Sequence, residues 1–516
     1  MQDVLMLLVL FIVPLAALQV LRAKRLRGKL PPGPPGLPII GNLLQLPKSR
    51  HWLLFNEWTK QYGPIFYLNI AGQNTVVLGS HKAAADLLDR RSNIYSNRAR
   101  NIVAGELLTG GMVFAFAHHN DLWRRQRRGA HEALSIQMSK NYFDFQERES
   151  VILLDQLLTA PDDWDNHLRR ASTSLVISVI YGTPPLLDSQ NPDILRVNRF
   201  TERALAAAIP GAYWVEYFTW MKYLPRWMCA WRRYAEDAFK ADSDMFEDLF
   251  ADVQKRIDAG DETTSVAATL IRDPGKKGLT DQEAAWLSAT LYAAGAETTS
   301  GQLAWFIQAM VLYPEIQRRA QEEIDRVVGN HRLPTFNDYE RLPYVRAIIR
   351  EIMRWRGIAP LAVPHRLGQD DYYEGYFLPK DTIFVVNVWA LHQDTDVYGE
   401  DVHRFNPGRH LDEHGNLKPA VQDTKDESHF SYGFGRRICV GRHIANNSMF
   451  IEIASMLWAL NISPEVDANG KAVLPNSLES IDEGLVVRPV PFRCRLTVRN
   501  PEAPGIVAQA KADRGL

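Results

Sequence analysis

The chain has 516 residues, of which 46% are hydrophobic and 23% charged, as is ordinary for a globular protein with a large core. Its formal net charge of -1 excludes a global field that would attract nucleic acid, so any anion or partner site must be a local patch. Cys229, Cys439 and Cys494 lie far apart and match neither a CxxC pair nor a zinc spacing, and an odd count argues against a disulfide framework. We therefore expect a reduced chain that faces the cytosol.

The first predicted element is a membrane anchor. Residues 4–21 (VLMLLVLFIVPLAALQVL) carry no charge and are just long enough to cross a bilayer as a helix. Cations cluster directly after this run, between residues 22 and 29, and the positive-inside rule then keeps the remainder of the chain in the cytoplasm. A cleaved signal peptide is the alternative, but it requires a basic region before the apolar run. We predict a single transmembrane helix at residues 4–21.

Residues 22–42 are predicted to form a basic flank and a proline-rich hinge. The segment 31–42 (PPGPPGLPIIGN) is too rich in proline for a helix and is typical of a semi-rigid spacer, with a flexible tail as the alternative. Two β-rich runs within residues 65–79 surround a Gly-Gln-Asn turn and predict a hairpin. Ser80 is then the expected N-cap of a helix.

The remainder of the chain is predicted to be mostly helical. Long helical periodicity runs from about residue 120 to residue 360, broken by short polar or proline loops. β-Branched stretches follow at residues 382–388 and 485–498, whereas residues 501–516 are small and polar and are expected to be disordered. The predicted fold class is mainly α with a small β part (α+β), as one large helix-rich domain over residues 43–500 behind the anchor.

Residues 431–441 (SYGFGRRICVG) form the motif with the clearest chemistry. A lone cysteine such as Cys439 can serve as an axial ligand of haem iron, where its thiolate donates electron density and favours O–O cleavage. Gly435 and Gly441 would let the main chain approach the sulfur and the porphyrin, and Arg437 could bind a haem propionate. The amphipathic run after Cys439 predicts a loop-to-helix transition there. A buried structural cysteine in a glycine turn is the alternative.

A second motif, YAAGAETTSG, lies in a long apolar helix predicted over residues 282–312. Gly295 lowers helix stability by about 1 kcal/mol relative to alanine, so a reason for it is expected: close approach to a flat cofactor, or tight helix packing. Glu297 and Thr298 are a neighbouring acid and alcohol, as a proton relay to bound oxygen requires. Alternatively, Thr298 bonds back to its own helix and Glu297 is a solvated charge.

Charged and aromatic residues elsewhere form pairs at helical spacing. Glu351 and Arg354 share one helix face and can form an ion pair, which Arg409 in the segment FNPGR could extend. Trp123 and Arg127 lie one turn apart, so an indole N–H and a guanidinium could share an anion such as a propionate. A surface ion pair and a solvated basic helix are the alternatives.

In chain order the motifs read WRRQR, AGAETT, EIMR, FNPGR and YGFGRRICVG, and this series resembles the cytochrome P-450 superfamily of haem-thiolate monooxygenases. The resemblance covers essentially the whole chain. It is similar to microsomal eukaryotic members and, among them, to fungal members of secondary metabolism. Tyr432 and Val440 depart from the usual cysteine loop, in which phenylalanine and proline are commoner, and this leaves the tuning of the redox potential open.

The resemblance implies a site built around haem b (iron protoporphyrin IX). It implies that Cys439 is the metal ligand and that Thr298 and Glu297 are catalytic in activating oxygen. The implied contacts with the haem propionates are Trp123, Arg127, His365 and Arg437. The implied structural triad of the proximal side is Glu351, Arg354 and Arg409. The resemblance implies that residues 101–116 line part of the substrate space. The apolar residues that would line it are Phe114, Leu291, Ala294, Leu361 and Val363.

The implied function is a membrane-bound monooxygenase that hydroxylates or otherwise oxidises a lipophilic small molecule with O2. Electrons would come from NADPH through a flavoprotein reductase at the endoplasmic reticulum membrane, with the catalytic domain facing the cytoplasm. Arginines that could dock the reductase are Arg124, Arg125, Arg128, Arg436 and Arg442. Two alternatives stay open. One is a reductase-independent haem-thiolate isomerase or dehydratase, and the other is a membrane-anchored cysteine hydrolase, which leaves AGAETT and EIMR without a role.

Overall fold

The computed structural model describes residues 28–187, 192–209, 212–216, 218–273, 275, 278–482 and 486–516. The fold divides into two compact units. The first comprises the chain up to Ala99, Ala359–Val402 and Phe430–Ile438, and the second comprises Arg100–Ile358, His403–His429 and Cys439–Leu516. Segments distant in sequence fold together within each unit. The single domain over residues 43–500 stays a prediction.

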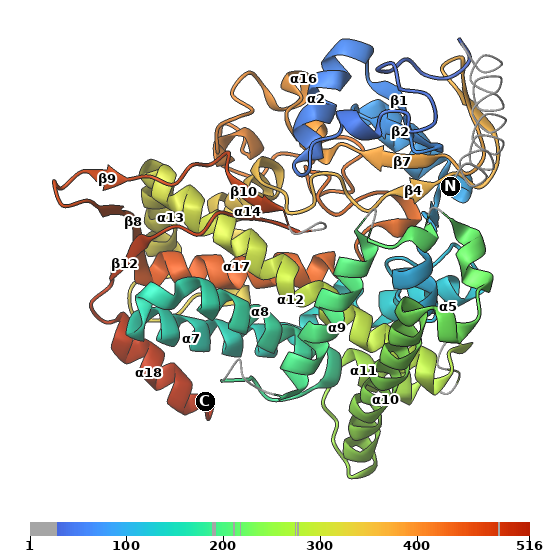
Figure 1. Cartoon of the computed structure of the whole chain (residues 1–516). Helices are drawn as coiled ribbons and strands as arrows, with labels where there is room; N and C mark the ends of the chain where they lie inside the picture. Colours follow the sequence, from blue (N-terminus) through green and yellow to red (C-terminus); the bar gives the residue numbers. More distant parts are fainter. Residues whose placement is uncertain are drawn as a thin grey trace, which may run out of the picture. The chain divides into compact units, whose positions relative to one another are not determined.

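The predictions for the two ends of the chain have different outcomes. The predicted anchor at residues 4–21 lies outside the described residues, and among those described no helix is both long and apolar enough to span a bilayer. The disorder predicted for residues 501–516 is wrong, because α18 (Ala503–Asp513) packs against α7 (Phe143–Thr159) (Figure 1). Small side chains such as Ala503 and Val507 allow this close packing and are fully buried.

The first unit is organised around a five-stranded sheet with the strand order β1-β2-β7-β4-β3, beside a β5-β6 hairpin. The strands are β1 (Ile65–Ile70), β2 (Gln73–Leu78), β3 (Asn97–Arg98), β4 (His365–Arg366), β5 (Asp371–Tyr373), β6 (Tyr376–Leu378) and β7 (Ile383–Val386). The helices and turns are η1 (Leu43–Gln45), α2 (His51–Tyr62), α3 (His81–Ala84), η2 (Ala85–Arg90), α4 (Ser92–Tyr95), α15 (Val388–His392), α16 (Thr395–Tyr398) and η12 (Gly435–Arg437). The antiparallel pairing of β4 with β7 sets His365 opposite Phe384.

The predicted hairpin and the strand predicted at residues 382–388 are both confirmed. Strands β1 and β2 pair antiparallel along their whole length, and the turn residues Ala71 and Gly72 both have positive φ, of 50° and 90°. Two such residues in a row are what a tight hairpin between twisted strands requires. Ser80 caps α3 as predicted, by accepting the Ala83 N–H at 3.3 Å.

The proline-rich segment packs against the sheet, which corrects its prediction as a spacer or a free tail. The Pro32 carbonyl accepts the Tyr67 N–H at 2.8 Å, so the segment covers the outer edge of β1. A Cβ on Gly33 would lie 2.0 Å from the Tyr67 carbonyl oxygen, so only glycine fits there. Asn42 holds the end of the segment by accepting the Asn69 N–H at 2.8 Å. A proline has no N–H to donate, but its carbonyl can still accept a hydrogen bond, and the edge strand β1 offers unpaired N–H groups as donors.

The second unit contains the long helices. They are α5 (Asp121–Ala133), α6 (Ile136–Ser139), α7, α8 (Trp164–Tyr181), α9 (Pro192–Ala208), α10 (Ala230–Asp258), α11 (Val266–Arg272), α12 (Asp281–Leu312), α13 (Pro314–Val327), α14 (Pro343–Trp355), α17 (Arg442–Ala459) and α18. The short turns are η3 (Ile102–Leu107), η4 (Lys140–Tyr142), η5 (Pro161–Asp163), η6 (Trp214–Glu216), η7 (Thr219–Tyr223), η8 (Arg226–Met228), η10 (Phe336–Arg341) and η11 (Pro407–His410). The strands are β8 (Leu460–Val466), β9 (Ala472–Val473), β10 (Ser480–Asp482), β11 (Val487–Pro489) and β12 (Cys494–Val498), in the sheets β12-β8-β9 and β10-β11.

The central helix of the second unit is α12, which confirms the helix predicted over residues 282–312. It packs against α8, α10 and α17 (Figure 1). A capping box between Thr280 and Glu283 begins the helix. Trp286 is fully buried and packs edge-to-face against Phe200 and Phe246, with ring centroids 5.7 and 5.0 Å apart. A helix that is apolar on all sides needs neighbours on all sides, and α12 has them on either side of residues 293–298.

Candidate functional site

Cys439 lies three residues ahead of α17, so the predicted loop-to-helix transition is confirmed. Its side chain is exposed, whereas Cys229 and Cys494 are buried. The surrounding protein still removes enough water to raise the pKa of the Cys439 thiol, against the opposing effects of the Gly441 N–H and the positive charge of Arg127. An accessible sulfur beside an N–H donor and a helix start is suited to bind a metal as thiolate. The alternative of a buried structural cysteine does not describe this residue.

Gly435 of the cysteine loop has a role that differs from the prediction, whereas the role of Gly441 stays a prediction. Gly435 has a φ of 56°, and a Cβ there would lie 2.1 Å from the Leu88 carbonyl oxygen of η2. Its N–H donates to the Asp89 carboxylate at 2.5 Å. Gly435 therefore allows the loop to pack onto η2 within the first unit, and this contact is a sufficient reason for glycine. An added Cβ on Gly441 would meet no atom within 4 Å.

The predicted pair Trp123 and Arg127 lies on α5, in the second unit. Trp123 is buried and stacks against Phe114 with ring centroids 6.1 Å apart, and the Arg127 guanidinium lies 6.0 Å from the same ring. Asn120 caps α5 by accepting the Trp123 N–H at 2.9 Å. Burial lowers the pKa of Arg127, and the nearby Cys439 raises it. The capped helix thus brings a partly desolvated guanidinium within electrostatic reach of Cys439.

His365 and Arg437 lie in the first unit, together with Arg98, which sequence reasoning missed. Pairing of β3 with β4 sets Arg98 opposite His365, and Arg437 Nε donates to the Ser96 carbonyl at 2.9 Å. Burial lowers the pKa of Arg98 to about 9. Burial and the charges of Arg98 and Arg437 hold the pKa of His365 well below its usual range. A buried group of basic side chains is stabilised by an anion, which is the property that a propionate site needs.

One face of α12 is accessible in the middle of an otherwise buried helix. Leu291, Ala294 and Thr298 follow one another at helical spacing, and Ala294 is exposed. The Thr298 hydroxyl donates to the Ala294 carbonyl at 3.0 Å, which is the local bond considered as an alternative. A Cβ on Gly295 would lie 2.9 Å from Val176 on α8. Tight packing of α12 against α8 is therefore a sufficient reason for this glycine, without a cofactor.

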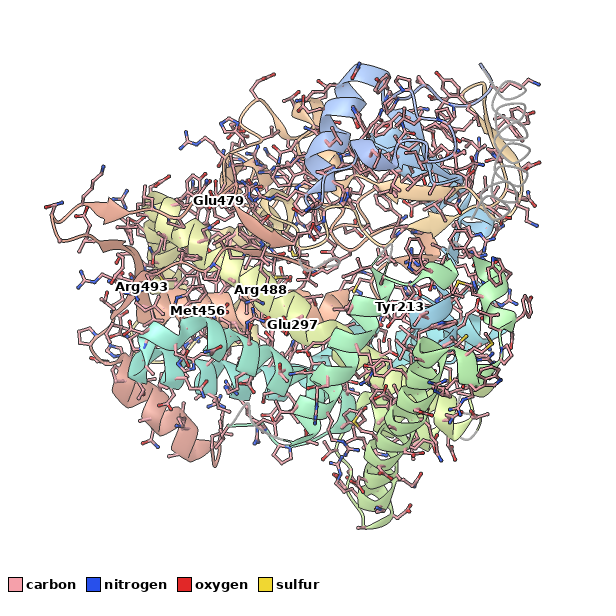
Figure 2. All side chains as sticks on the ribbon, viewed as in Figure 1. Tyr213, Glu297, Met456, Glu479, Arg488 and Arg493 are labelled. Carbon is pink, nitrogen blue, oxygen red and sulfur yellow. The ribbon has the colours of Figure 1, made fainter. Side chains whose placement is uncertain are left out.

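Glu297 belongs to an ion-pair network. It accepts from Arg169 Nη1 at 3.1 Å and lies 3.7 Å from Arg488 Nη1 (Figure 2). Asp165 accepts from the same two arginines, at 3.0 and 2.6 Å. Glu297 is therefore neither a solvated lone charge nor an unencumbered acid, because it ties α12 to α8 and to β11.

The structure brings Glu351, Arg354 and Arg409 into one buried network. Arg354 donates to both Glu351 oxygens, at 2.7 and 2.8 Å, and Arg409 Nε donates at 3.0 Å. His410 and the Asn406 N–H also bond to Glu351, each at 2.9 Å, and neither was predicted. Burial alone would raise the pKa of Glu351, but Arg354 and His410 hold it well below its usual range. The network joins α14 to η11.

The predicted lining residues are divided between the units. Phe114, Leu291 and Ala294 lie in the second unit, and Leu361 and Val363 lie in the first. Leu361 packs against the apolar cluster of β1 and β2, and the Val363 carbonyl accepts from Arg98 Nη1 at 2.5 Å. Within the second unit, Phe114 belongs with α5 through its ring contact. Each unit thus carries both apolar lining candidates and cationic groups.

The arginines predicted to dock a reductase differ in whether they are ion-paired within the protein or exposed to solvent. Arg125 is engaged by Glu283, with 2.7 Å between Nη1 and the carboxylate, so it is a poor docking residue. Arg124 and Arg128 are exposed one turn apart on α5. Arg436 is exposed in the first unit. Of the residues predicted on α5, Arg124 and Arg128 are the two that present a charged head to solvent.

Fold and site together define a helix-rich protein with one exposed cysteine close to an arginine and just ahead of a helix. Comparisons with known proteins identify the family to which the chain belongs. The model of the cytochrome P-450 family matches residues 31–493. A cytochrome P-450 monooxygenase of Armillaria gallica is 51% identical over 483 residues, which cover 93% of this chain and 92% of that protein. The chain belongs to the cytochrome P-450 family and is an oxidoreductase of the monooxygenase type.

Two further relatives show how wide the similarity is. Cytochrome P-450 monooxygenase 58 of Postia placenta is 45% identical over 473 residues, covering 92% of this chain and 89% of its own. Cytochrome P-450 monooxygenase iboC of Amanita muscaria is 41% identical over 542 residues, covering 96% of each chain. These relatives therefore match the chain over nearly its whole length. The cysteine hydrolase considered from the sequence is thereby excluded.

The cofactor of this family is haem, and the residues of this chain fit it. Cys439 offers an accessible thiol whose negative charge the Gly441 N–H and Arg127 stabilise. In the first unit, the buried bases His365 and Arg98 form a group that an anion would stabilise. Guanidinium groups are well suited to bind carboxylates such as haem propionates.

Proposed function

We propose that this protein is a membrane-bound haem-thiolate monooxygenase that hydroxylates or otherwise oxidises a lipophilic small molecule in secondary metabolism. A flavoprotein reductase passes it electrons from NADPH at the endoplasmic reticulum membrane, on the cytoplasmic side. The observation that carries the proposal is the exposed Cys439 thiol ahead of α17, within electrostatic reach of Arg127. The monooxygenases of three fungi that match nearly the whole chain support it.

The chain's own residues hold and orient the cofactor. The haem, when bound, supplies the oxidative chemistry with O2. Cys439 holds the iron, and the Gly441 N–H spreads the negative charge of the sulfur and so limits its basicity. Arg127, in the same unit as Cys439, would bind a propionate, and within the first unit the basic group of Arg98 and His365 has the charge that suits such an anion. The apolar lining residues exclude water and favour a lipophilic substrate.

Thr298 handles the proton in this proposal. Its hydroxyl now donates to the Ala294 carbonyl at 3.0 Å, and a rotation about χ1 would aim that proton away from the helix. Ala294 and Thr298 share the accessible face of α12, so the hydroxyl can reach a group bound there. Glu297 stays ion-paired to Arg169 and holds the helix in place.

An aromatic surface supports attachment to a membrane. Every exposed tryptophan or phenylalanine among the described residues lies between residues 214 and 227: Trp214, Phe218, Trp220 and Trp227, which we call the aromatic face. Their exposed fractions are 72, 49, 60 and 76%. Aromatic side chains are enriched where proteins meet the bilayer interface, and a run of them is costly to leave in water. The uncharged run at residues 4–21 points to the same location.

The carbon monoxide difference spectrum of the reduced protein tests the central claim. Wild type and Cys229→Ala should both give the red-shifted Soret band of a thiolate-bound haem, because Cys229 is a buried thiol at the start of α10. Cys439→Ala should lose that band while it retains its helical circular dichroism. A band that survives in Cys439→Ala would sink the assignment of the iron ligand.

The reductase and the membrane are tested separately. Full-length protein should oxidise a lipophilic substrate only when a flavoprotein reductase and NADPH are both present. A reductase-independent isomerase or dehydratase would turn over without them. Arg124→Glu together with Arg128→Glu should slow reduction of the haem iron by the reductase at low salt more than at high salt. Equal reduction rates at both salt concentrations would remove α5 from the docking surface.

A further inference from the structure

Two segments of the second unit, residues 100–107 and 212–223, are held together by a pair of carboxylates. Glu216 accepts the backbone N–H groups of Ile102 and Val103, both at 2.8 Å. Glu106, in the first of the two segments, accepts a hydrogen bond from Lys222 of the second at 2.5 Å. The two segments thus exchange bonds in both directions, and we call this arrangement the carboxylate clasp (Glu216 with Ile102 and Val103, Glu106 with Lys222).

The clasp closes over an apolar cluster of its own. Ile102, Val103, Ala104 and Leu108 pack with Val215 in a cluster separate from the main core of the unit. Because both N–H groups sit in this apolar setting, an acceptor has to be supplied for them. A carboxylate is a stronger acceptor than a neutral group, and one carboxylate here serves two donors. Glu216 therefore fixes the start of η3 together with its N-cap Asn101, whose side chain accepts the Ala104 N–H at 2.8 Å.

The same segment carries Trp214, Phe218 and Trp220 of the aromatic face. Val215 is buried and Glu216 reaches into the clasp, while Trp214 and Phe218 are exposed. Tyr213 and Met221 pack onto the apolar cluster from this segment. The segment that carries these exposed side chains is therefore also the segment that is hydrogen-bonded to η3 through Glu216. Binding of the exposed side chains to another surface would restrict the motion of that segment. No other segment is needed to connect the exposed side chains to η3.

We infer that Glu216 is a positioning residue that couples the aromatic face to residues 101–107, so that attachment of this face to a membrane steadies the wall of the substrate space. The inference rests on the proposed function in two respects: that the aromatic face meets a bilayer, and that residues following Asn101 line the substrate space. The carboxylate clasp itself depends on neither. Loosening it should therefore change local exchange even in a protein that never meets a vesicle.

Hydrogen exchange of the full-length holoprotein in detergent tests the clasp. Exchange at the amides of residues 102 and 103 should rise about tenfold in Glu216→Ala, because two charge-assisted bonds are lost. Glu216→Gln keeps one accepting oxygen and should give an intermediate rate. Glu202→Ala removes an exposed carboxylate of α9 and should leave these amides at the wild-type rate. Unchanged exchange in Glu216→Ala at an unchanged melting temperature would overturn the clasp.

Ligand binding tests the link to the substrate space. Clotrimazole, a bulky lipophilic imidazole, and imidazole itself both bind haem iron and shift the Soret band. Glu216→Ala should weaken clotrimazole about fivefold and leave imidazole unchanged, since only the larger ligand contacts the wall. Glu216→Gln should restore part of the loss, which a general loss of stability would not do. Equal dissociation constants for clotrimazole in wild type and Glu216→Ala would overturn the positioning role.

Vesicles of phosphatidylcholine and phosphatidylserine separate this inference from the proposed function. Binding should shift tryptophan emission to the blue in wild type and in Glu216→Ala alike, but should protect residues 101–107 from exchange only in wild type. Equal protection in both proteins would overturn the coupling. Absence of the emission shift in wild type would overturn the membrane role of the aromatic face and its coupling to η3, and would leave the clasp to be decided by exchange in detergent.

Discussion

Two carboxylates of the second unit are equally buried and respond to burial in opposite ways. Glu351 on α14 accepts from Arg354, Arg409 and His410, and its pKa lies well below the usual range. Glu452 on α17 is 1% exposed, and among the described residues neither of its oxygens has a hydrogen-bond partner. Burial, with the nearby charge of Glu149, raises the pKa of Glu452 to about 8. Depth of burial therefore does not fix the charge state; the number of donors around the carboxylate does.

The difference also separates two uses of α14 and α17, which pack against each other. Around Glu351, the charges hold one arrangement of α14 and η11, because any change leaves a buried ion without a partner. Around Glu452, the carboxyl is tolerated as a neutral group, and Arg170 serves Glu149 at 2.5 Å instead. We therefore expect mutation of Glu351 to lower the free energy of unfolding, and ionisation of Glu452 to lower it. The predictions below test that contrast.

The largest effect is expected from Glu351→Gln. Arg354 and Arg409 would keep their charges in a buried site with one oxygen fewer and no counter-ion, which costs about 3–5 kcal/mol of the free energy of unfolding. Urea unfolding of the purified protein measures this loss. Glu340→Gln is the matched control, because its ion pair with Arg346 at 2.6 Å has an exposed carboxylate, and it should change stability by less than about 1 kcal/mol. Similar losses in both variants would contradict the role given to burial.

The second effect is a pH dependence that Glu452→Gln should remove. In the folded chain this carboxyl keeps its proton up to about pH 8, whereas its ordinary pKa is 4.5. Between these values the folded state binds more protons than the unfolded state. The Glu452 contribution is therefore fully present below pH 4.5 and is lost as the pH rises toward 8. The free energy of unfolding of wild type relative to Glu452→Gln should fall by about 2–3 kcal/mol between pH 5 and pH 7.

Unfolding curves at pH 5, 6 and 7 measure this slope. Burial also raises the pKa of Glu149, but Glu149 is present in both proteins, so most of its effect cancels in the difference. Glu479→Gln, an exposed carboxyl of the same unit (Figure 2), should leave the slope of wild type unchanged. A wild-type curve that runs parallel to that of Glu452→Gln would show that Glu452 ionises at its ordinary pKa in the folded state.

Local pattern was enough to predict the elements that local chemistry decides. The apolar helix α12, the β1–β2 hairpin and the Ser80 cap all follow from residues adjacent in sequence. For Cys439 and for Trp123 with Arg127, each motif carries its own chemistry within a few residues, and the roles assigned to them at the cofactor stay predictions. The tail at residues 501–516 was missed because small side chains read as weak patterning, although they allow α18 to pack closely on α7.

What could not be predicted depends on segments that are distant in sequence. Arg98 belongs to the basic group only because β3 pairs with β4, and His410 bonds to Glu351 only because η11 packs on α14. Gly435 was assigned to the cofactor because the loop was considered alone, without Leu88 above it. Glu452 carried no signal, since one acid in an apolar helix is equally compatible with a surface position. Tertiary neighbours decide each of these cases.

The smallest effect on stability is expected from a third kind of carboxylate, one that is paired but only half-buried. Glu297 has two arginine neighbours, as Glu351 has, yet 39% of its side chain is exposed. Solvent screens such a pair, so Glu297→Gln should cost less than about 1 kcal/mol in urea unfolding. A loss as large as that of Glu351→Gln would show that pairing, rather than burial, sets the cost.

The neighbouring Thr298 should show the reverse behaviour, with a functional effect and little change in stability. Thr298→Ala should uncouple NADPH consumption from product formation and release peroxide, because the hydroxyl that handles the proton is gone, while Thr298→Ser should restore coupling. Glu297→Gln should remain coupled, because the ion pairs of Glu297 hold α12 in place and do not carry the proton. Peroxide release from Glu297→Gln at the level of Thr298→Ala would return Glu297 to the relay. It would also show that Arg169 and Arg488 release the carboxylate during turnover.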